Sequence, residues 1–374
     1  MRHARLKPKE DRRLVRGHLW VYRNEIAALP SLEDGEVVDV VADRGRFVGR
    51  GFFQAKGGIA IRILSRHQEG IDAAFLARRI NDAHAFRSRL FPGETAYRWV
   101  FGESEGLPGL VADRYGSVVA AETSCGFYAL WGEALASAFL AYDGVEGVRI
   151  TVGDAVRTFG AVPDTLEFSM DGLRVEVDFR TGQKTGLFFD QRLNYLAMRP
   201  YAAGARVLDG CCYVGLWSCH AAKAGARTVL GVDTSSQAID QARRIARLNA
   251  VEQICTFEKA DIAEVLELGE RYDLIVLDPP ALAKSRDQTK KALGLYQALN
   301  RAAMKAISSG GYLITSSCSH FVDTPAFLEA LKRAAAAAQR HLWLLDVRGA
   351  APDHPVLLAM PETAYLTCAT LRVL

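Results

Sequence analysis

A cysteine and an aspartate each stand directly after an apolar, strand-like run, which is where α/β enzymes place reactive side chains. Cys318 follows GYLITSS, and Asp278 follows YDLIVL and precedes Pro279 and Pro280. A cysteine taken alone is most simply a small buried hydrophobe. Here serines flank Cys318 and His320 comes two places later, and polar or cationic neighbours favour the thiolate. We therefore treat Cys318 as a candidate nucleophile that faces one substrate together with Asp278.

Three more acids end strands in a second group of motifs. In RVLDGCCYVGLWS, Asp209 ends a strand and Gly215 opens a helix, and Asp233 and Asp261 end the next two strands. A dinucleotide site needs G-x-G-x-x-G for close approach to a pyrophosphate, and this turn lacks that triplet. An acid in the turn suits a cofactor with an amine and a sulfonium, S-adenosylmethionine (SAM). We expect Asp233 on the ribose hydroxyls and Asp261 on the adenine amine; in the alternative, Gly215 and Asp233 only form a tight turn and a helix cap.

The residue after the two prolines helps to distinguish methylation of an exocyclic amine from methylation of a ring carbon. Enzymes that methylate exocyclic amines commonly carry an aromatic side chain there to stack the target base, and this chain has Ala281. Methylation of a pyrimidine at C5 poses a different problem, because C5 becomes nucleophilic only when a thiolate adds to C6. Cys318 would supply that thiolate, so we favour C5 methylation over N-methylation.

The elements that would hold these residues alternate regularly after residue 183. Apolar strands rich in β-branched residues alternate with amphipathic helices, which predicts an α/β fold with a parallel, doubly wound sheet. The expected order is RVLDGC, a helix from about 215, TVLGVD, a helix over about 236–249, TFEKAD, YDLIVLDPP, a helix near 291–308, and GYLITSS. WLLDVR and AYLTCATLRVL follow, and we expect the latter to close the sheet as an antiparallel edge pair.

Two other modules are predicted before residue 183. Short β-rich runs punctuated by glycines between Gly35 and Ile63 predict a small antiparallel barrel, so residues 1–67 form one domain. Residues 68–182 read as an α+β domain: an amphipathic helix from Ala73 to Phe86, strands YRWVFG, LVAD, SVVAAET and VRITV, a helix near 126–141, and a hairpin at Asp171-Gly172. The third domain covers 183–374.

Positive charge gathers at the start of the chain. Residues 1–23 carry eight Lys or Arg against two acids, whereas the whole chain of 374 residues has a net charge of only +3. His18, Trp20 and Tyr22 are interleaved with the basic residues. The segment is either a solvated arm or a surface that contacts nucleic-acid phosphates and stacks on bases.

The cysteines and the hydropathy pattern argue against several other classes of protein. Seven cysteines occur without a C-x-x-C pair, so neither a zinc site nor a disulfide framework is indicated. No apolar run approaches the roughly 18 residues that a membrane span needs. We expect a soluble, cytoplasmic protein without a metal.

Four motifs in order resemble the large-subunit ribosomal RNA cytosine-C5 methyltransferases that carry an N-terminal PUA domain: GQKTGLFFDQRLN (182–194), VLDGCCYVGLWS (207–218), LDPPALAKS (277–285) and GGYLITSSCSH (310–320). The resemblance extends over the rest of the chain through RLVRGHLWVYRNEI, FGESEGLPGLVADRYG, APDHPVL and PETAYL. It implies an RNA-binding PUA domain over 1–67, a central EEHEE-like domain over 68–182, and a Rossmann-like class I methyltransferase domain over 183–374.

The resemblance also implies roles for individual residues. Cys318 becomes the nucleophile, and Asp278 contacts the cytosine ring edge and borders SAM. The remaining cofactor set is Phe188, Asp190, Gln191, Arg192, Asp209, Cys211, Tyr213, Gly215, Asp233, Thr234 and Asp261. The RNA-binding set is Arg12, Arg13, Arg16, His18, Trp20 and Lys284.

Two departures from the family pattern matter. The glycine turn usually reads closer to D-L-F-C-Y-T-G-G-F-S, but Asp209, Cys212, Tyr213 and Gly215 are kept here, so the cofactor class is retained. Two-cysteine RNA cytosine methyltransferases carry a second cysteine where this chain has Ala281. His320 and Lys284 are the candidates for a group that helps release the product.

The sequence thus predicts transfer of a methyl group from SAM to C5 of a cytosine in 23S rRNA. Uracil-C5 methylation is an alternative because it needs the same thiolate, and so is an RNA-binding protein with a vestigial methyltransferase fold. The expected partner is large-subunit rRNA, no membrane is expected, and a homodimer is left open.

Overall fold

The computed structural model describes residues 2–180, 185–283 and 285–374 of the chain. It divides into two compact units, one made of 1–169, 177–187 and 352–363, the other of 170–176, 188–351 and 364–374. The predicted site residue Lys284 and part of the GQKTG motif lie outside the described residues. The predicted α/β class is confirmed, and the boundaries of the three predicted domains stay predictions.

The first unit begins with a six-stranded sheet in the order β2-β6-β5-β4-β1-β3. All its neighbouring pairs are antiparallel except β1 and β4. The three predicted runs EVVDVV, RFVGRGFF and IAIRIL form β4, β5 and β6, whereas the basic N-terminal segment contributes strands of its own. The elements are β1 (His3–Leu6), α1 (Arg12–Val15), β2 (Trp20–Tyr22), β3 (Ile26–Ala28), β4 (Val37–Val41), β5 (Phe47–Phe53) and β6 (Ile59–Ser65).

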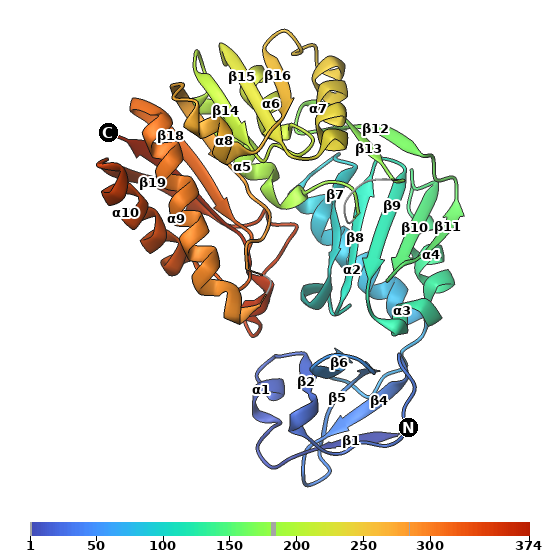
Figure 1. The fold of residues 1–374 in the computed structure, drawn as a ribbon. Helices are drawn as coiled ribbons and strands as arrows, with labels where there is room; N and C mark the ends of the chain where they lie inside the picture. Colours follow the sequence, from blue (N-terminus) through green and yellow to red (C-terminus); the bar gives the residue numbers. More distant parts are fainter. Residues whose placement is uncertain (1, 181–184, 284) are drawn as a thin grey trace. The chain divides into compact units, whose positions relative to one another are not determined.

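A second sheet of five strands follows in the first unit, in the order β11-β10-β9-β8-β7. Helix α2 (Ala73–Leu90) starts at Asp72, whose carboxylate accepts the amide of Phe75, and buries Phe75, Leu76 and Ile80. In Figure 1, α2 and α4 lie against this sheet. The other elements are β7 (Ala96–Phe101), β8 (Leu110–Tyr115), β9 (Val118–Thr123), α3 (Gly126–Leu130), α4 (Gly132–Leu140), β10 (Gly147–Val152) and β11 (Ala155–Gly160).

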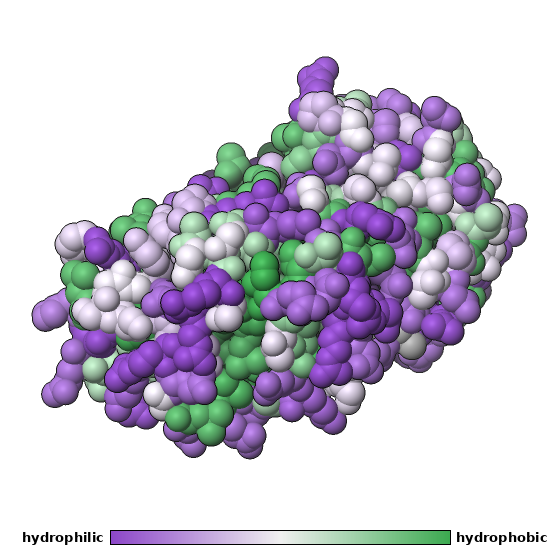
Figure 2. Space-filling model, turned by 90° about the horizontal axis from the view of Figure 1, so that it is seen from above, coloured by the Kyte–Doolittle hydropathy of each residue, from purple (hydrophilic) through white to green (hydrophobic). Residues whose placement is uncertain are grey.

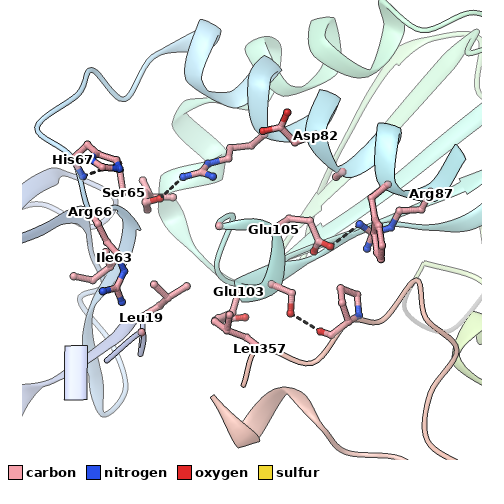
Figure 3. A pocket seen from close by; sticks show the side chains of 18 residues that line it. Leu19, Ile63, Ser65, Arg66, His67, Asp82, Arg87, Glu103, Glu105 and Leu357 are labelled. Atoms are coloured by element: carbon pink, nitrogen blue, oxygen red, sulfur yellow. Dashed lines mark hydrogen bonds and ion pairs between the residues drawn. The ribbon is translucent and has the colours of Figure 1, made fainter. Parts of the chain in front are cut away.

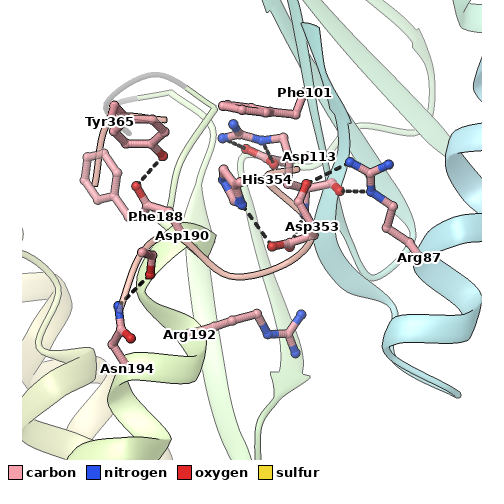
Figure 4. A network of polar contacts seen from close by, with 12 residues as sticks. Arg87, Phe101, Asp113, Phe188, Asp190, Arg192, Asn194, Asp353, His354 and Tyr365 are labelled. Atoms are coloured by element: carbon pink, nitrogen blue, oxygen red, sulfur yellow. Dashed lines mark hydrogen bonds and ion pairs between the residues drawn. The ribbon is translucent and has the colours of Figure 1, made fainter. Parts of the chain in front are cut away.

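A segment from near the C-terminus completes the first unit through a buried polar network (Figure 4). Arg87 Nη2 donates to the carbonyl of Asp353 at 2.7 Å, and Asp353 Oδ2 accepts the amide of Arg98 at 3.0 Å. The Nδ1 atom of His354 lies 2.9 Å from Asp353 Oδ1. Since Arg87 and Asp353 are fully buried, these bonds anchor the segment against the second sheet.

The hairpin of β12 (Thr165–Met170) and β13 (Leu173–Asp178) has its turn in the second unit and its outer ends in the first. Asp171 and Gly172 both have positive φ, 51° and 81°. Those angles are typical of a two-residue hairpin turn, so the Asp-Gly prediction is confirmed.

The second unit is built on a seven-stranded sheet in the order β16-β15-β14-β17-β18-β20-β19. The five strands from β16 to β18 are parallel, and β20 is antiparallel to both of its neighbours. The strands are β14 (Arg206–Gly210), β15 (Thr228–Asp233), β16 (Cys255–Lys259), β17 (Tyr272–Leu277), β18 (Ile307–Ser317), β19 (Leu342–Arg348) and β20 (Thr367–Val373). The last run, AYLTCATLRVL, lies between β18 and β19, so β19 is the edge.

Helix α5 (Arg192–Met198) precedes the first strand of this sheet, and the other helices of the second unit follow its strands. They are α6 (Leu216–Lys223), α7 (Ser236–Leu248), α8 (Ile262–Glu267), α9 (Thr289–Ala306) and α10 (Thr324–Ala338). Figure 1 shows α9 and α10 side by side in orange and red. The connections place the reversal of strand order between β14 and β17, where open α/β sheets bind ligands at their carboxyl ends.

The surface is largely hydrophilic, with hydrophobic side chains scattered among the polar ones on the face that Figure 2 shows. Within the described residues, no helix combines the length and the apolar character that crossing a membrane requires.

Candidate functional site

The turn after β14 has an unusual backbone. Cys211 and Tyr213 are not glycines, yet their φ angles are 62° and 48°, and Gly215 follows at 78°. Such positive angles cost energy for side chains other than glycine and concentrate at functional sites. A Cβ atom at Gly215 would lie 2.7 Å from the ring of Phe257, so the start of α6 requires glycine on both grounds.

Asp233, at the end of β15, is held against this turn by two backbone amides. Its Oδ2 accepts the amide of Tyr213 at 3.0 Å, and its Oδ1 accepts the amide of Ser235 at 2.8 Å. The side chain is only half-buried, and Thr234 beside it is exposed. The carboxylate is thus oriented at the sheet edge with lone pairs left for further donors.

Asp261 follows β16 and is exposed at the sheet edge. Its carboxylate caps α8 by accepting the amide of Ala263 at 2.8 Å. Helix capping therefore accounts for part of its hydrogen-bonding capacity, and the structure leaves its exposed face open to a ligand.

Asp209 is fully buried, unlike the other strand-end acids. Its Oδ2 accepts both the amide and the hydroxyl of Ser218, at 3.0 and 2.6 Å. Burial raises the pKa of Asp209 to about 7, while the Ser218 hydrogen bonds oppose that rise. Its Oδ1 is buried without a hydrogen-bond partner among the described residues.

Asp278 follows β17, and two side chains fix its carboxylate. Gln191 Nε2 donates to Oδ1 at 2.9 Å, and Trp217 Nε1 donates to Oδ2 at 3.0 Å. Gln191 also donates to the hydroxyl of Ser316 at 3.0 Å and is held by Asn194, whose amide donates to its Oε1 at 2.7 Å. Burial raises the pKa of Asp278 to about 6, and the charge of Asp190 adds to the rise.

The segment that leads into α5 borders the same edge. The ring of Phe188 meets that of Tyr213 edge-on at 5.2 Å. Asp190 Oδ2 accepts the hydroxyl of Tyr365 at 2.6 Å, and the two side chains point toward each other in Figure 4. Asp190 Oδ1 is buried without a hydrogen-bond partner among the described residues.

Arg192 differs from the rest of this predicted set. Its guanidinium is fully buried and forms two hydrogen bonds with the carboxylate of Asp171, at 2.7 and 3.1 Å. A buried bidentate ion pair of this kind holds α5 to the hairpin turn. The structure therefore gives Arg192 a structural partner, and its place in the cofactor set stays a prediction.

Cys318 lies one residue beyond β18 and next to Asp278 in space. The two strands are parallel neighbours, with Leu277 opposite Thr315. The thiol of Cys318 donates to the carbonyl of Pro279 at 3.6 Å, and the side chain is half-buried. The structure thus brings together the cysteine and the Asp-Pro-Pro exit that the sequence analysis paired.

The residue after Cys318 fixes the neighbouring loop. The hydroxyl of Ser319 accepts the amides of Leu282 and Ala283, at 3.0 and 3.2 Å, and lies 3.1 Å from the hydroxyl of Tyr296. His320 is exposed, and its ring lies 5.3 Å from that of Tyr365. Ser319 therefore ties the segment after Ala281 to the strand end that carries the thiol.

The basic N-terminal segment uses several of its predicted RNA-binding side chains internally. Arg13 pairs with Glu25 at 2.8 Å, and Trp20 Nε1 donates to Glu103 at 2.7 Å. His18 is buried, and its Nδ1 accepts the amide of Trp20 at 3.1 Å. Arg12 and Arg16, by contrast, are exposed and form no ion pair within the described part of the chain.

Trp217 and Tyr365 are side chains of the site that the sequence analysis did not single out, and Ser319 was noted there only as a serine that makes the surroundings of Cys318 polar. Trp217 and Tyr365 lie 61 and 175 positions from the carboxylates that they contact. The only available signal was that both are amphipathic aromatics, whose polar ends take a hydrogen-bond partner when buried.

The sheet edge is strongly acidic, and this bears on the cofactor. The charges of Asp209, Asp233, Asp261 and Asp278 add to the burial that raises the pKa of Cys211 to about 12. Two carboxylate oxygens, on Asp190 and Asp209, are buried without a hydrogen-bond partner among the described residues. A ligand with an amine and a sulfonium fits this donor-poor, negative surrounding, and the edge would repel a pyrophosphate. No cluster of His, Cys, Asp and Glu suited to a metal ion occurs in residues 2–180, 185–283 and 285–374.

Comparison with known proteins agrees with this geometry. Residues 4–66 match the PUA-like domain, and residues 151–356 match the S-adenosylmethionine-dependent methyltransferases. The chain belongs to the S-adenosylmethionine-dependent methyltransferases. Like them, this methyltransferase uses SAM as its cofactor, which confirms the choice of SAM over a dinucleotide.

Full-length relatives carry a more specific name. A protein of Shewanella denitrificans called ribosomal RNA large subunit methyltransferase I is 34% identical, over 99% of this chain and 98% of its own. A protein of the same name from Erwinia tasmaniensis is 33% identical, over 97% of both chains. The predicted resemblance to this group of methyltransferases is confirmed.

A solved structure shares the whole fold. A protein described as a SAM-dependent methyltransferase from Streptococcus mutans has a TM-score of 0.86 and 19% identity, with complete coverage of both chains. A second structure, SMU.776, complexed with SAH, has a TM-score of 0.88 and 20% identity, again over both complete chains. At this identity the likeness concerns the fold.

Proposed function

We propose that this methyltransferase transfers a methyl group from SAM to C5 of a cytosine in large-subunit ribosomal RNA, with Cys318 as the nucleophile. The names of the full-length relatives support rRNA as the substrate class. The PUA-like match over residues 4–66 supports contact with RNA. The observation that carries the proposal is the contact between the Cys318 thiol and the carbonyl of Pro279 at 3.6 Å, beside Asp278.

The cofactor, when bound, supplies an electrophilic methyl group on its sulfonium. On the protein side, Asp233 would accept the ribose hydroxyls, because its two backbone hydrogen bonds orient it at the sheet edge. The unpartnered oxygens of Asp190 and Asp209 would face the cationic part of the cofactor. Gly215 and the strained turn before it allow the backbone to approach the ligand closely.

Cys318 and Asp278 would act on the cytosine base, each with a different role. The Cys318 thiolate adds to C6 of the cytosine, which moves electron density to C5. Asp278, fixed by Gln191 and Trp217, would hold the cytosine ring edge and its exocyclic amine. After C5 has gained the methyl group, loss of the C5 proton expels the cysteine and restores the aromatic ring. The base must leave its stack to meet these groups.

The test is methyl transfer by Cys318→Ala and Cys368→Ala. Both thiols are near the end of β18, but Cys368 lies on β20 opposite Ser316, is buried, and serves as the matched control. We expect Cys318→Ala to lose 5-methylcytidine formation entirely while it still binds SAM, and Cys368→Ala to keep activity. Undiminished C5 methylation by Cys318→Ala would contradict the proposal.

The product distinguishes the alternatives. Nuclease digestion and mass spectrometry should yield 5-methylcytidine; 5-methyluridine would instead assign the uracil-C5 reaction. Calorimetry with SAM tests the vestigial fold, because a protein that does not bind millimolar SAM would be an RNA-binding protein only.

A further inference from the structure

A cavity of about 580 Å³ lies within the first unit between β6, helix α2 and the turn around 102–106 (Figure 3). It has the volume of an ordinary small-ligand pocket. The predicted RNA-binding residues Arg12, Arg13 and Arg16 are not part of its lining. Gly17 and Leu19 of the N-terminal segment do line the cavity, but its predicted RNA-contacting arginines do not.

Two arginines of the cavity form no ion pair with the described residues. Arg66 donates to the carbonyl of Val15 at 3.3 Å, and Arg79 Nη2 donates to the carbonyl of Leu64 at the same distance. Arg79 Nε is buried without a hydrogen-bond partner among the described residues. Neither guanidinium forms an ion pair in the described part of the chain. A buried donor without a partner is costly, and an anionic ligand would satisfy it.

The acids of the cavity are mostly neutralised by other groups. Glu103 pairs with Arg62 at 2.7 Å, and Glu105 pairs with Arg87 at 2.6 Å. Only Asp82 remains exposed and outside any ion pair of the described residues. Arg66 and Arg79, which form no ion pair among the described residues, thus outnumber the one lining carboxylate outside ion pairs.

An aromatic ring forms part of the apolar lining. Phe86 is 39% exposed although it is a large hydrophobic residue, and the guanidinium of Arg87 lies 5.1 Å from its ring centroid. Leu19, Leu64 and Ala83 extend the apolar lining. Phe86 shares this lining with Arg66 and Arg79. Aromatic rings and cations together bind single-stranded nucleic acid, because bases stack and phosphates pair with cations.

We infer that this cavity binds one nucleotide of a single-stranded RNA segment. Arg66 and Arg79 take the phosphodiester, Phe86 stacks on the base, and Asp82 accepts a ribose hydroxyl. The inference rests on the proposed function for RNA as the partner, and it adds a second contact to RNA away from the methyl-transfer site residues.

The test measures binding of a short labelled single-stranded RNA to the full chain by fluorescence anisotropy, without SAM, over a range of salt concentrations. Arg66→Gln/Arg79→Gln should bind about tenfold more weakly, with a salt slope smaller by about 0.7, because the contact with one phosphodiester releases about 0.7 counterion on a single strand. Phe86→Ala should weaken binding about tenfold without a change of slope, because stacking involves no counterion. Arg89→Gln is the matched control: Arg89 is an exposed arginine of α2 outside the cavity, and its replacement should leave binding unchanged.

Wild-type affinity and slope in the double variant would overturn the inference. A mononucleotide that binds as tightly as the RNA would also overturn it, because the cavity would then serve a free nucleotide. Thermal unfolding checks each variant, and if the double variant does not fold, Arg66→Gln alone carries the test because that side chain is exposed. Failure of the proposed function is distinguishable, since it would appear as absent 5-methylcytidine with RNA affinity intact.

Discussion

The basic N-terminal segment and the acidic edge of the seven-stranded sheet each concentrate one sign of charge, but they differ in whether those charges form ion pairs within the fold. In the N-terminal segment, Arg13 pairs with Glu25, so part of the positive charge is neutralised by an ion pair within the fold. At the sheet edge, the hydrogen bonds that Asp209 and Asp278 accept from the described residues come from neutral groups, Ser218, Gln191 and Trp217.

This difference in ion pairing indicates which of the two regions binds a charged ligand. Opposite charges that pair within a fold need no further partner. At the sheet edge, burial raises the pKa of Asp209 and of Asp278, and the charges of neighbouring carboxylates add to the rise. Such an arrangement indicates a bound cation, and the cationic part of SAM satisfies it.

Removing one acid from the edge should give the largest effect. We expect Asp233→Asn to weaken SAM binding about 100-fold, equal to about 2.7 kcal/mol, because it loses a charged acceptor for the ribose hydroxyls. Titration calorimetry measures the change. Asp240→Asn is the control, since that exposed acid of α7 pairs with Arg243; equal losses in both variants would mean that general charge, rather than position, governs affinity.

Asp209 should make the stability of the protein depend on pH. Its pKa of about 7 in the fold exceeds the ordinary value of 3.8, so the folded state holds the proton more tightly than the unfolded chain does. The resulting stabilisation is complete below about pH 4 and is lost as the pH rises to about 7. Asp209→Asn cannot ionise, so relative to this variant the free energy of unfolding of the wild type should fall by about 2 kcal/mol between pH 5 and pH 8.

Urea unfolding of the two proteins at both pH values provides the measurement. If the free energies of unfolding of the two proteins changed with pH in parallel, Asp209 would titrate as an ordinary exposed carboxyl. The difference expected between the acidic sheet edge and the N-terminal segment would then be absent at this residue.

Trp217→Phe should have a smaller effect, on catalysis. The indole N–H favours the ionised form of Asp278, so its loss should raise the pKa of that carboxyl from about 6. If ionised Asp278 holds the cytosine amine, the acidic limb of the pH–rate profile moves to higher pH and methyl transfer near pH 6 falls about tenfold. A lower rate with an unmoved profile would mean that Trp217 only fills space.

The smallest effect concerns the paired cation of the N-terminal segment. Arg13→Gln should lower the free energy of unfolding by about 1 kcal/mol, because it breaks a partly buried ion pair. Arg12→Gln should leave stability unchanged, since Arg12 is exposed. Denaturant titration of both variants tests the difference, and equal stabilities would remove the structural role assigned to Arg13.

The sequence by itself determined the alternating strands and helices and the acids at strand ends. Asp209, Asp233 and Asp278 directly follow or end apolar runs, so their place at the carboxyl edge follows from local pattern and parallel topology. The same logic brought Cys318 beside Asp278. Strand β11 was missed because its exposed residues give no core-facing alternation.

Only the tertiary structure decided which partners those side chains take. Gln191 and Trp217 reach Asp278 from 87 and 61 positions away, and the cavity that includes Arg66 also draws on Leu357. The tertiary structure also showed that Arg192 is a buried partner of Asp171. Local periodicity specifies the face on which a side chain lies, whereas the groups that meet it across that face depend on how whole elements pack.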